Sequence, residues 1–179
     1  MEIYLIRHAH SPKLSDCEAE SDQDRPLGEK GQHQSRTLAL SLQERNVQPE
    51  VILSTPLLRA KQTAEIMVES WQGTKPKLVI EKRLTPECKP RKLKRILQEQ
   101  EKEHVAVVGH EPDLGWWASW LIGSSKANIQ FAKAGVAHIH WEDKLKKGTG
   151  TLLWLVTPDW YSPTPERAST TNPEEVEKN

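Results

Sequence analysis

Arginine and histidine residues occur at or shortly after the ends of three short apolar runs. They are Arg7, His8, Arg59 and His110. Because ligands bind at the carboxyl ends of the strands in an open α/β sheet, we expect these side chains to converge on one pocket. Two guanidinium groups can hold phosphoryl oxygens in bidentate fashion, and an unprotonated imidazole can attack phosphorus near neutral pH. The set therefore indicates phosphoryl transfer through a histidine.

Strand-like and helix-like segments alternate along the chain and must position these residues. Short apolar runs predict strands at residues 3–6, 51–53, 78–80 and 105–109. Alternating apolar residues predict a final hairpin formed by residues 136–141 and 151–157. Apolar spacing, proline positions and strand-to-helix junctions predict helices over residues 29–45, 57–71, 90–102 and 113–122. Such alternation predicts a three-layer α/β/α fold with a mostly parallel central sheet.

The composition of the chain argues against several classes of protein. The 179 residues are typical of one domain, and 25 basic residues balance 25 acidic ones, which argues against a nucleic-acid binder. Apolar runs are too short to span a membrane, and the N-terminus has no signal-peptide pattern. Two cysteines are too few for a disulfide framework, so we expect a cytoplasmic protein. We expect one domain over residues 1–161 and a disordered tail over 162–179, which has little apolar surface to bury.

Several motifs, in this order, resemble the histidine phosphatase superfamily, which includes the phosphoglycerate mutases and acid phosphatases. They are Arg7-His8, then Ser54-Thr55-Pro56 leading to Arg59-Ala60, then Gly109-His110. The short length and two further segments are similar to the SixA-type phosphohistidine phosphatases: Asp24-Arg25-Pro26-Leu27 and Leu84-Thr85-Pro86. The resemblance covers roughly residues 2–157 and implies a phosphoglycerate mutase-like fold.

The resemblance also implies a role for each matching residue. His8 would take the phosphoryl group as a transient phosphohistidine, and water would then release inorganic phosphate. Arg7, Arg59 and His110 would hold the phosphoryl oxygens, largely by positioning and electrostatic stabilisation. Cationic neighbours would keep His8 unprotonated. Arg25 and Glu111 are further candidates for substrate or phosphate contacts, although pairing with the acidic loop around it explains Arg25 equally well.

The general acid is one point at which the chain departs from the pattern of the superfamily that it resembles; Ala9, where many members have glycine, is another. Members that cleave phosphate esters usually present a glutamate after the third strand, and the nearest match is Glu87, with Asp113 as second choice. An alkoxide leaving group needs a proton donor, whereas an imidazole leaving from phosphorus can be protonated beforehand. The loose match of Glu87 therefore favours phosphohistidine on a protein as the substrate.

Other functions stay open on the sequence alone. The chain is a candidate for a small-molecule phosphomonoesterase of the same superfamily, or for a non-catalytic module that binds phosphoproteins. The spacings His8-x-His10 and His138-x-His140 are compatible with a metal-dependent hydrolase, but no supporting ligands accompany them, so we expect no metal and no cofactor. We expect a phosphohistidine-bearing protein as partner, no nucleic acid or membrane partner, and a monomer.

Two features near these motifs have both a structural and a functional interpretation. Trp116, Trp117 and Trp120 follow His110 at helical spacing; they are expected to pack in the core, although one of them could line a groove for a protein substrate. A run of basic residues between 89 and 95 is typical of a solvated helix face, but near a phosphate pocket it could steer an acidic partner.

Overall fold

The computed structural model describes residues 1–124, 126–142 and 146–162. The tail predicted at 162–179 therefore lies, apart from its first residue, outside the described residues. Within the described ranges, no helix has both the length and the apolar character needed to cross a lipid bilayer.

A six-stranded sheet forms the centre of the molecule, with the strand order β3-β2-β4-β1-β5-β6. The strands are β1 (Glu2–Arg7), β2 (Val51–Ser54), β3 (Lys77–Ile80), β4 (His104–Gly109), β5 (Val136–Trp141) and β6 (Gly150–Val156). The first four are parallel, whereas β5 pairs antiparallel with β1 and β6 pairs antiparallel with β5. The predicted mostly parallel sheet and the predicted hairpin are both confirmed.

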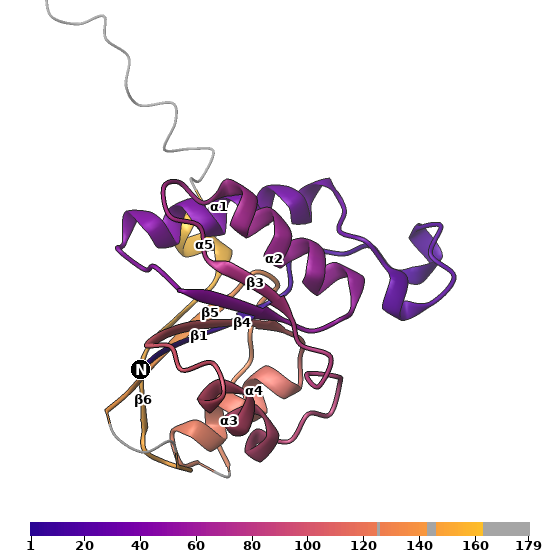
Figure 1. The fold of residues 1–179 in the computed structure, drawn as a ribbon. Coiled ribbons are helices and arrows are strands. Elements are labelled where there is room, and N and C mark those ends of the chain that lie inside the picture. Colours follow the sequence, from indigo (N-terminus) through magenta and orange to yellow (C-terminus); the bar gives the residue numbers. More distant parts are fainter. Residues whose placement is uncertain (125, 143–145, 163–179) are drawn as a thin grey trace, which may run out of the picture.

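Helices cover both faces of this sheet (Figure 1). One face carries α1 (Glu29–Glu44), α2 (Leu58–Ser70) and the short α5 (Pro158–Tyr161), and the other carries α3 (Pro90–Gln98) and α4 (Asp113–Leu121). The three-layer α/β/α prediction is therefore correct. The helix expected over 90–102 ends at Gln98, because the backbone turns before β4 and Glu101 has a φ of 51°.

The alternation of side chains along β1 explains why its apolar run is continuous. Ile3 and Leu5 belong to the core on the α3 and α4 side, whereas Tyr4 and Ile6 belong to the core on the α1 and α2 side. A strand covered on both faces needs apolar residues at every position. Burial on both sides holds β1 in the middle of the sheet, where its carboxyl end is surrounded by its neighbours.

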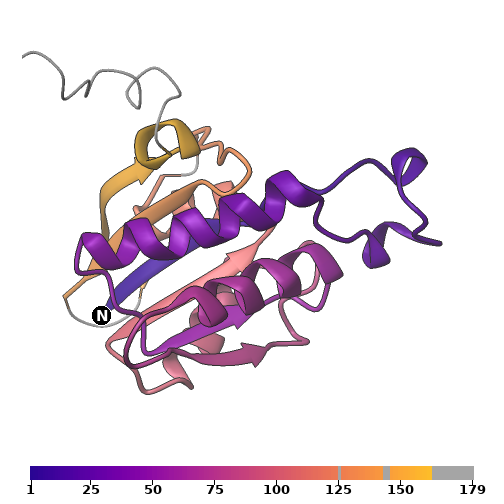
Figure 2. The same ribbon diagram turned by 90° about the horizontal axis from the view of Figure 1, so that it is seen from above.

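The loop after β1 leaves the carboxyl edge of the sheet and returns at α1. It contains two short 3₁₀ helices, η1 (Leu14–Asp16) and η2 (Asp22–Asp24), and extends well beyond the layers (Figure 2). The return requires a close approach, since a Cβ at Gly31 would lie 2.0 Å from the carbonyl oxygen of His10. Gly31 therefore lets α1 pack directly against the start of this loop.

Candidate active site

His8 and His110 lie side by side at the ends of adjacent strands. β1 and β4 are paired in a register that places Arg7 opposite Gly109. The backbone N–H of His8 donates to the Gly109 carbonyl at 3.0 Å. The two imidazole rings are tilted by 50° with centroids 4.9 Å apart, and their side chains are 6% and 7% exposed. Parallel pairing therefore brings together two histidines from distant parts of the sequence.

A backbone carbonyl determines which nitrogen of His8 carries the proton. Nδ1 lies 2.7 Å from the carbonyl oxygen of Ala9. Because a carbonyl can only accept, Nδ1 donates the hydrogen bond and Nε2 keeps its lone pair. Burial is the largest cause of a pKa of about 3 for His8; the charges of His110, Arg59 and Arg7 act in the same direction, and the bond to Ala9 opposes the shift. The sequence pointed to cationic neighbours as the cause, but burial is the larger one.

His110 is held by a threonine at the end of the next strand. Thr55 follows β2, and its Oγ1 lies 2.7 Å from Nε2 of His110. Burial lowers the pKa of His110 to about 4, and the positive charge of Arg59 contributes as well. Nδ1 of His110 is buried and has no hydrogen-bond partner within the part of the chain that the structure describes. His110 is therefore neutral at pH 7. The contact with Thr55 was not predicted, although Thr55 lies inside a recognised motif.

Arg7 and Arg59 bring their guanidinium groups to the same edge of the sheet. Arg59 lies in the first turn of α2 and is 6% exposed, and Nη1 of Arg7 donates to the Phe131 carbonyl at 2.6 Å. The Nε atoms of both arginines are buried without a hydrogen-bond partner among the described residues. Buried polar atoms are nearly always paired, so these donors and Nδ1 of His110 mark a site that suits an oxyanion.

An aspartate from the loop after β1 already contacts Arg59. Asp22 accepts a hydrogen bond from Nη1 of Arg59 through its backbone carbonyl at 2.6 Å and from Nη2 through Oδ2 at 3.1 Å. Its Oδ1 lies 2.9 Å from Nε of Arg25, whose Nη1 donates to the Pro12 carbonyl at 2.8 Å. Of the two roles expected for Arg25 from the sequence, the structure shows the pairing within the acidic loop. Asp22 was not singled out from the other acids of this loop.

Lys133 is a further cation at this edge that the sequence analysis missed. It precedes β5, and its Nζ donates to the Ser11 carbonyl at 3.3 Å. Burial lowers the pKa of Lys133, and the charges of Arg7, Arg25 and Arg59 lower it further, so the four cations lie close together. No local motif marks Lys133, because it reaches the site only where the chain returns from α4 to pair with β1.

Known proteins are similar to this chain in sequence and in fold. Residues 3–86 match the family described as the histidine phosphatase superfamily (branch 1). An uncharacterised protein of Picosynechococcus sp. is 32% identical over 169 residues, which cover 91% of this chain and 100% of that protein. The phosphohistidine phosphatase SixA of Escherichia coli K12 is 28% identical over 161 residues, which cover 88% of this chain and 94% of that protein. The chain belongs to the histidine phosphatase superfamily.

The fold of this chain is also similar to that of a solved structure. The protein histidine phosphatase SixA in complex with tungstate superposes with a TM-score of 0.76 at 26% identity, covering 89% of this chain and 98% of that chain. The predicted phosphoglycerate mutase-like fold is therefore confirmed. Together with the family match, the likeness supports phosphatase activity.

Three carboxylates lie near the N-terminus of α4, and the sequence singled out all three. Asp113 is buried, which raises its pKa, and its Oδ2 accepts the backbone N–H of Cys88 at 3.2 Å. Glu111 accepts the backbone N–H of Phe131 at 2.6 Å. Glu87 is exposed at a φ of 66°, and its carboxylate has no hydrogen bond or ion pair among the described residues. Asp113 and Glu111 therefore hold backbone segments, and Glu87 is left as the carboxylate without such a contact.

The histidine pairs considered as metal ligands have other partners. His138 and His140 on β5 each contact one carboxylate oxygen of Glu2 at 2.5 Å. His10 lies in the loop after β1, where its backbone N–H donates to Oε1 of Gln34. Among the residues that the structure describes, no group of three or more His, Cys, Asp or Glu side chains is arranged to hold a metal ion. The spacing of His138 and His140 reflects a shared partner on β1.

Proposed function

We propose that this histidine phosphatase removes the phosphoryl group from phosphohistidine residues of proteins through a transient phosphohistidine on His8. The observation that carries the proposal is the hydrogen bond from Nδ1 of His8 to the Ala9 carbonyl, which leaves Nε2 as an unprotonated nucleophile in a buried site. The similarity to SixA supports it, since that protein is a phosphohistidine phosphatase and binds tungstate, a tetrahedral oxyanion like phosphate.

The reaction proceeds in two transfers. In the first, the Nε2 lone pair of His8 attacks phosphorus, the Nε2–P bond forms, and the N–P bond to the substrate imidazole breaks. The substrate histidine leaves with the electron pair of that bond and with the proton on its other ring nitrogen, so it departs as a neutral imidazole. In the second, water attacks phosphorus, the Nε2–P bond breaks, and inorganic phosphate is released.

Arginine and histidine side chains stabilise the charge on the transferred group. Arg7 and Arg59 hold phosphoryl oxygens, His110 is the fourth member of the clamp, and Arg25 contributes at its edge. These groups are positioned before the substrate arrives, and burial strengthens their interaction with a developing charge. In this scheme the protein's own cations neutralise the phosphoryl group, so the reaction needs no metal ion and no cofactor.

The leaving group favours phosphohistidine over a phosphate ester. An alkyl ester requires an acid that protonates the departing oxygen. Asp113 is buried, but its carboxylate accepts the backbone N–H of Cys88, and Glu87 is exposed. Neither of them is therefore a buried carboxyl that is free to protonate a leaving oxygen. Phosphohistidine needs no such acid. We further propose that the functional domain spans residues 1–161 and that the protein acts as a monomer in the cytoplasm on a phosphohistidine-bearing protein.

The test compares three substrates, each with and without a metal chelator: a phosphohistidine peptide, p-nitrophenyl phosphate and glycerol phosphate. We expect the highest kcat/KM on the phosphohistidine peptide under both conditions. His8→Ala should abolish turnover, and acid-free quenching followed by mass spectrometry should place the phosphoryl group on His8. His33→Ala, at an exposed position on α1, is the matched control and should behave as wild type. Retention of activity within a few-fold in His8→Ala would refute the mechanism.

Glu87→Gln separates the two substrate classes. We expect this change to leave turnover of phosphohistidine nearly unchanged, to depress turnover of the alkyl phosphate, and to affect the activated aryl phosphate much less. Strong wild-type activity on the alkyl phosphate that Glu87→Gln abolishes would instead identify a small-molecule phosphomonoesterase. An equal and large loss of kcat/KM on all three substrates would indicate that Glu87 is either a general acid for every substrate or a structural residue.

A further inference from the structure

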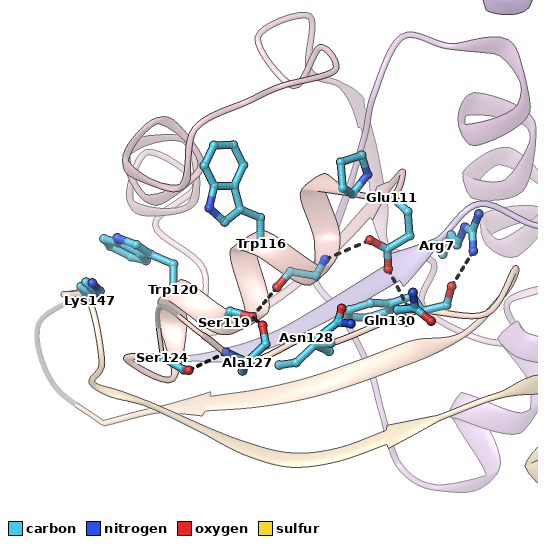
Figure 3. A pocket seen from close by; sticks show the side chains of 14 residues that line it. Arg7, Glu111, Trp116, Ser119, Trp120, Ser124, Ala127, Asn128, Gln130 and Lys147 are labelled. Carbon is cyan, nitrogen blue, oxygen red and sulfur yellow. Dashed lines mark hydrogen bonds between the residues drawn. The ribbon is translucent and has the colours of Figure 1, made fainter.

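A groove with a volume of about 620 Å³ starts at Arg7 and runs along α4 (Figure 3). The exposed side of α4 forms one wall, and the segment that leads from α4 to β5 forms the other. In Figure 3, Arg7 lies at one end of the lining residues and Lys147 at the other, with Trp116 and Trp120 between them. The groove is therefore continuous with the proposed catalytic site and leads away from it.

Hydrogen bonds and a close contact hold the two walls together. Glu111 bonds the backbone N–H groups of Phe131 at 2.6 Å and Gly115 at 3.4 Å, which ties the start of α4 to the opposite wall. A Cβ at Gly115 would lie 2.1 Å from the Ile129 carbonyl oxygen, so glycine permits this approach. Ser119 Oγ bridges the walls further along the groove, through the carbonyls of Gly115 and Ala127. The shape of the groove is thus set by the fold.

The tryptophans of α4 divide between the core and the groove. Trp117 is 1% exposed and donates from Nε1 to the Cys88 carbonyl at 2.7 Å, as expected for core packing. Trp116 is 52% exposed, and Trp120, one turn further, is partly buried; both line the groove. Exposed tryptophan beside a catalytic site is typical of protein-binding surfaces, because a large rigid ring gives contact area at little entropic cost.

A second hollow of about 460 Å³ adjoins the far end of the groove and shares Trp120 and Lys147 with it. Its other lining residues are strongly basic: Arg91, Lys94, Arg95 and Lys146, with Gln98. Among the described residues, none of these cations forms an ion pair with a carboxylate. Glu99 beside them is paired with Arg83 at 2.7 Å. We call the five cations Arg91, Lys94, Arg95, Lys146 and Lys147 the basic patch.

We infer that the groove and the basic patch bind an acidic segment of the protein that carries the phosphohistidine. This inference rests on the proposed function, and it adds where and by what chemistry the substrate protein is recognised. Continuity with Arg7 lets one chain place its phosphohistidine at His8 and its flanking residues over Trp116 and Trp120. The unpaired cations complement carboxylates at the far end. The balanced charge of the whole chain favours a protein over a nucleic acid as the occupant.

The test uses the full-length protein and phosphohistidine peptides of equal length that carry a flanking run of glutamate, glutamine or lysine. Wild type should have a kcat/KM about tenfold higher on the glutamate peptide than on the glutamine peptide at low salt, since several exposed pairs each contribute modestly. The preference should approach unity at high salt. The combined variant Arg91→Glu, Lys94→Glu, Arg95→Glu should lose or reverse this preference.

A matched control carries the same change in net charge elsewhere on the surface. Arg36→Glu, Lys75→Glu and Lys77→Glu together alter exposed residues on α1 and around the start of β3, and this variant should keep the wild-type ratio. Trp116→Ala should lower kcat/KM about fivefold on all peptides without changing the ratio between them. Absence of an acidic preference in wild type, or its persistence after reversal of the basic patch, would overturn the inference.

Binding of the unphosphorylated glutamate peptide, measured by fluorescence anisotropy, distinguishes this inference from the proposed function. If the peptide binds tightly to wild type and not to the variant with the reversed basic patch, the docking surface is supported. If, in addition, no phosphohistidine peptide is hydrolysed, only the proposed function is refuted. Hydrolysis of all peptides at equal rates would refute only the docking surface. Displacement of the peptide by a single-stranded RNA oligonucleotide of higher affinity would reassign the surface to nucleic acid.

Discussion

Replacing His8 by Asn should make the stability of the protein less sensitive to acid. In the folded state, burial holds the pKa of His8 at about 3, against 6.5 for an exposed histidine. The unfolded chain therefore takes up the proton first as the pH falls. The free energy of unfolding contributed by this group is fully present above pH 6.5 and is lost progressively between pH 6.5 and 3.

The expected size follows from the two pKa values. At pH 5 the folded His8 is still neutral, whereas protonation stabilises the unfolded state by about 2 kcal/mol relative to pH 7.5. The loss depends on the unfolded-state pKa alone, as long as the folded group stays neutral. Asn at position 8 does not titrate, and its side-chain N–H can donate to the Ala9 carbonyl in place of Nδ1. The variant should therefore lose about 2 kcal/mol less than wild type over this pH interval.

Urea unfolding followed by tryptophan fluorescence at pH 7.5 and pH 5.0 measures the difference. His33→Asn is the control, because His33 is exposed on α1 and should leave the pH dependence of wild type unchanged. Equal pH dependence of wild type and His8→Asn, within about 0.5 kcal/mol, would mean that folded His8 is protonated at pH 5. That result would refute the argument that burial keeps His8, the proposed nucleophile, neutral.

Substitutions at three further positions test the site and the loop packing that supports it. Arg59→Ala should lower kcat/KM on the phosphohistidine peptide about a hundredfold. Arg59→Lys should recover only part of the lost activity, since an ammonium group cannot donate two parallel hydrogen bonds as a planar guanidinium does. Full recovery by lysine would refute bidentate binding. Asp22→Asn should lower the inhibition constant of inorganic phosphate about tenfold, because the carboxylate that contacts Arg59 and Arg25 is replaced by a neutral amide; weaker inhibition would mean that Asp22 positions Arg59 for phosphate. Gly31→Ala should lower the free energy of unfolding in urea by about 2 kcal/mol, because its Cβ would lie 2.0 Å from the His10 carbonyl oxygen. Alanine has the better helix propensity by about 1 kcal/mol, so a gain in stability would show that the loop moves aside freely.

The elements of the fold could be predicted from the sequence because their signals are local. A strand covered on both faces is a short continuous apolar run, and β1, β2 and β4 all have this pattern. Alternation of these runs with helical spacing leads to parallel strands and to helices on both faces. Element ends were less predictable: α3 ends at Gln98, because tertiary structure decides where the chain turns into β4.

The candidate site residues could be found at the strand ends for the same reason. Arg7, His8 and His110 follow apolar runs directly, and the carboxyl ends of parallel strands share one edge. Lys133 and Asp22 could not be found in this way, because each reaches the site through a long loop whose course depends on packing elsewhere.

The sequence by itself determined the order of elements, the arginine and histidine residues that follow the strands, and the superfamily. Only the tertiary structure decided the chemical state of those residues: the tautomer of His8, the neutrality of both histidines, and the contact between Asp22 and Arg59. The physical reason is that hydrophobic periodicity is a property of neighbouring residues in the chain. Desolvation and hydrogen-bond direction depend on every group that surrounds a side chain, and those groups come from β1, β2, β4, α2 and the loops between them.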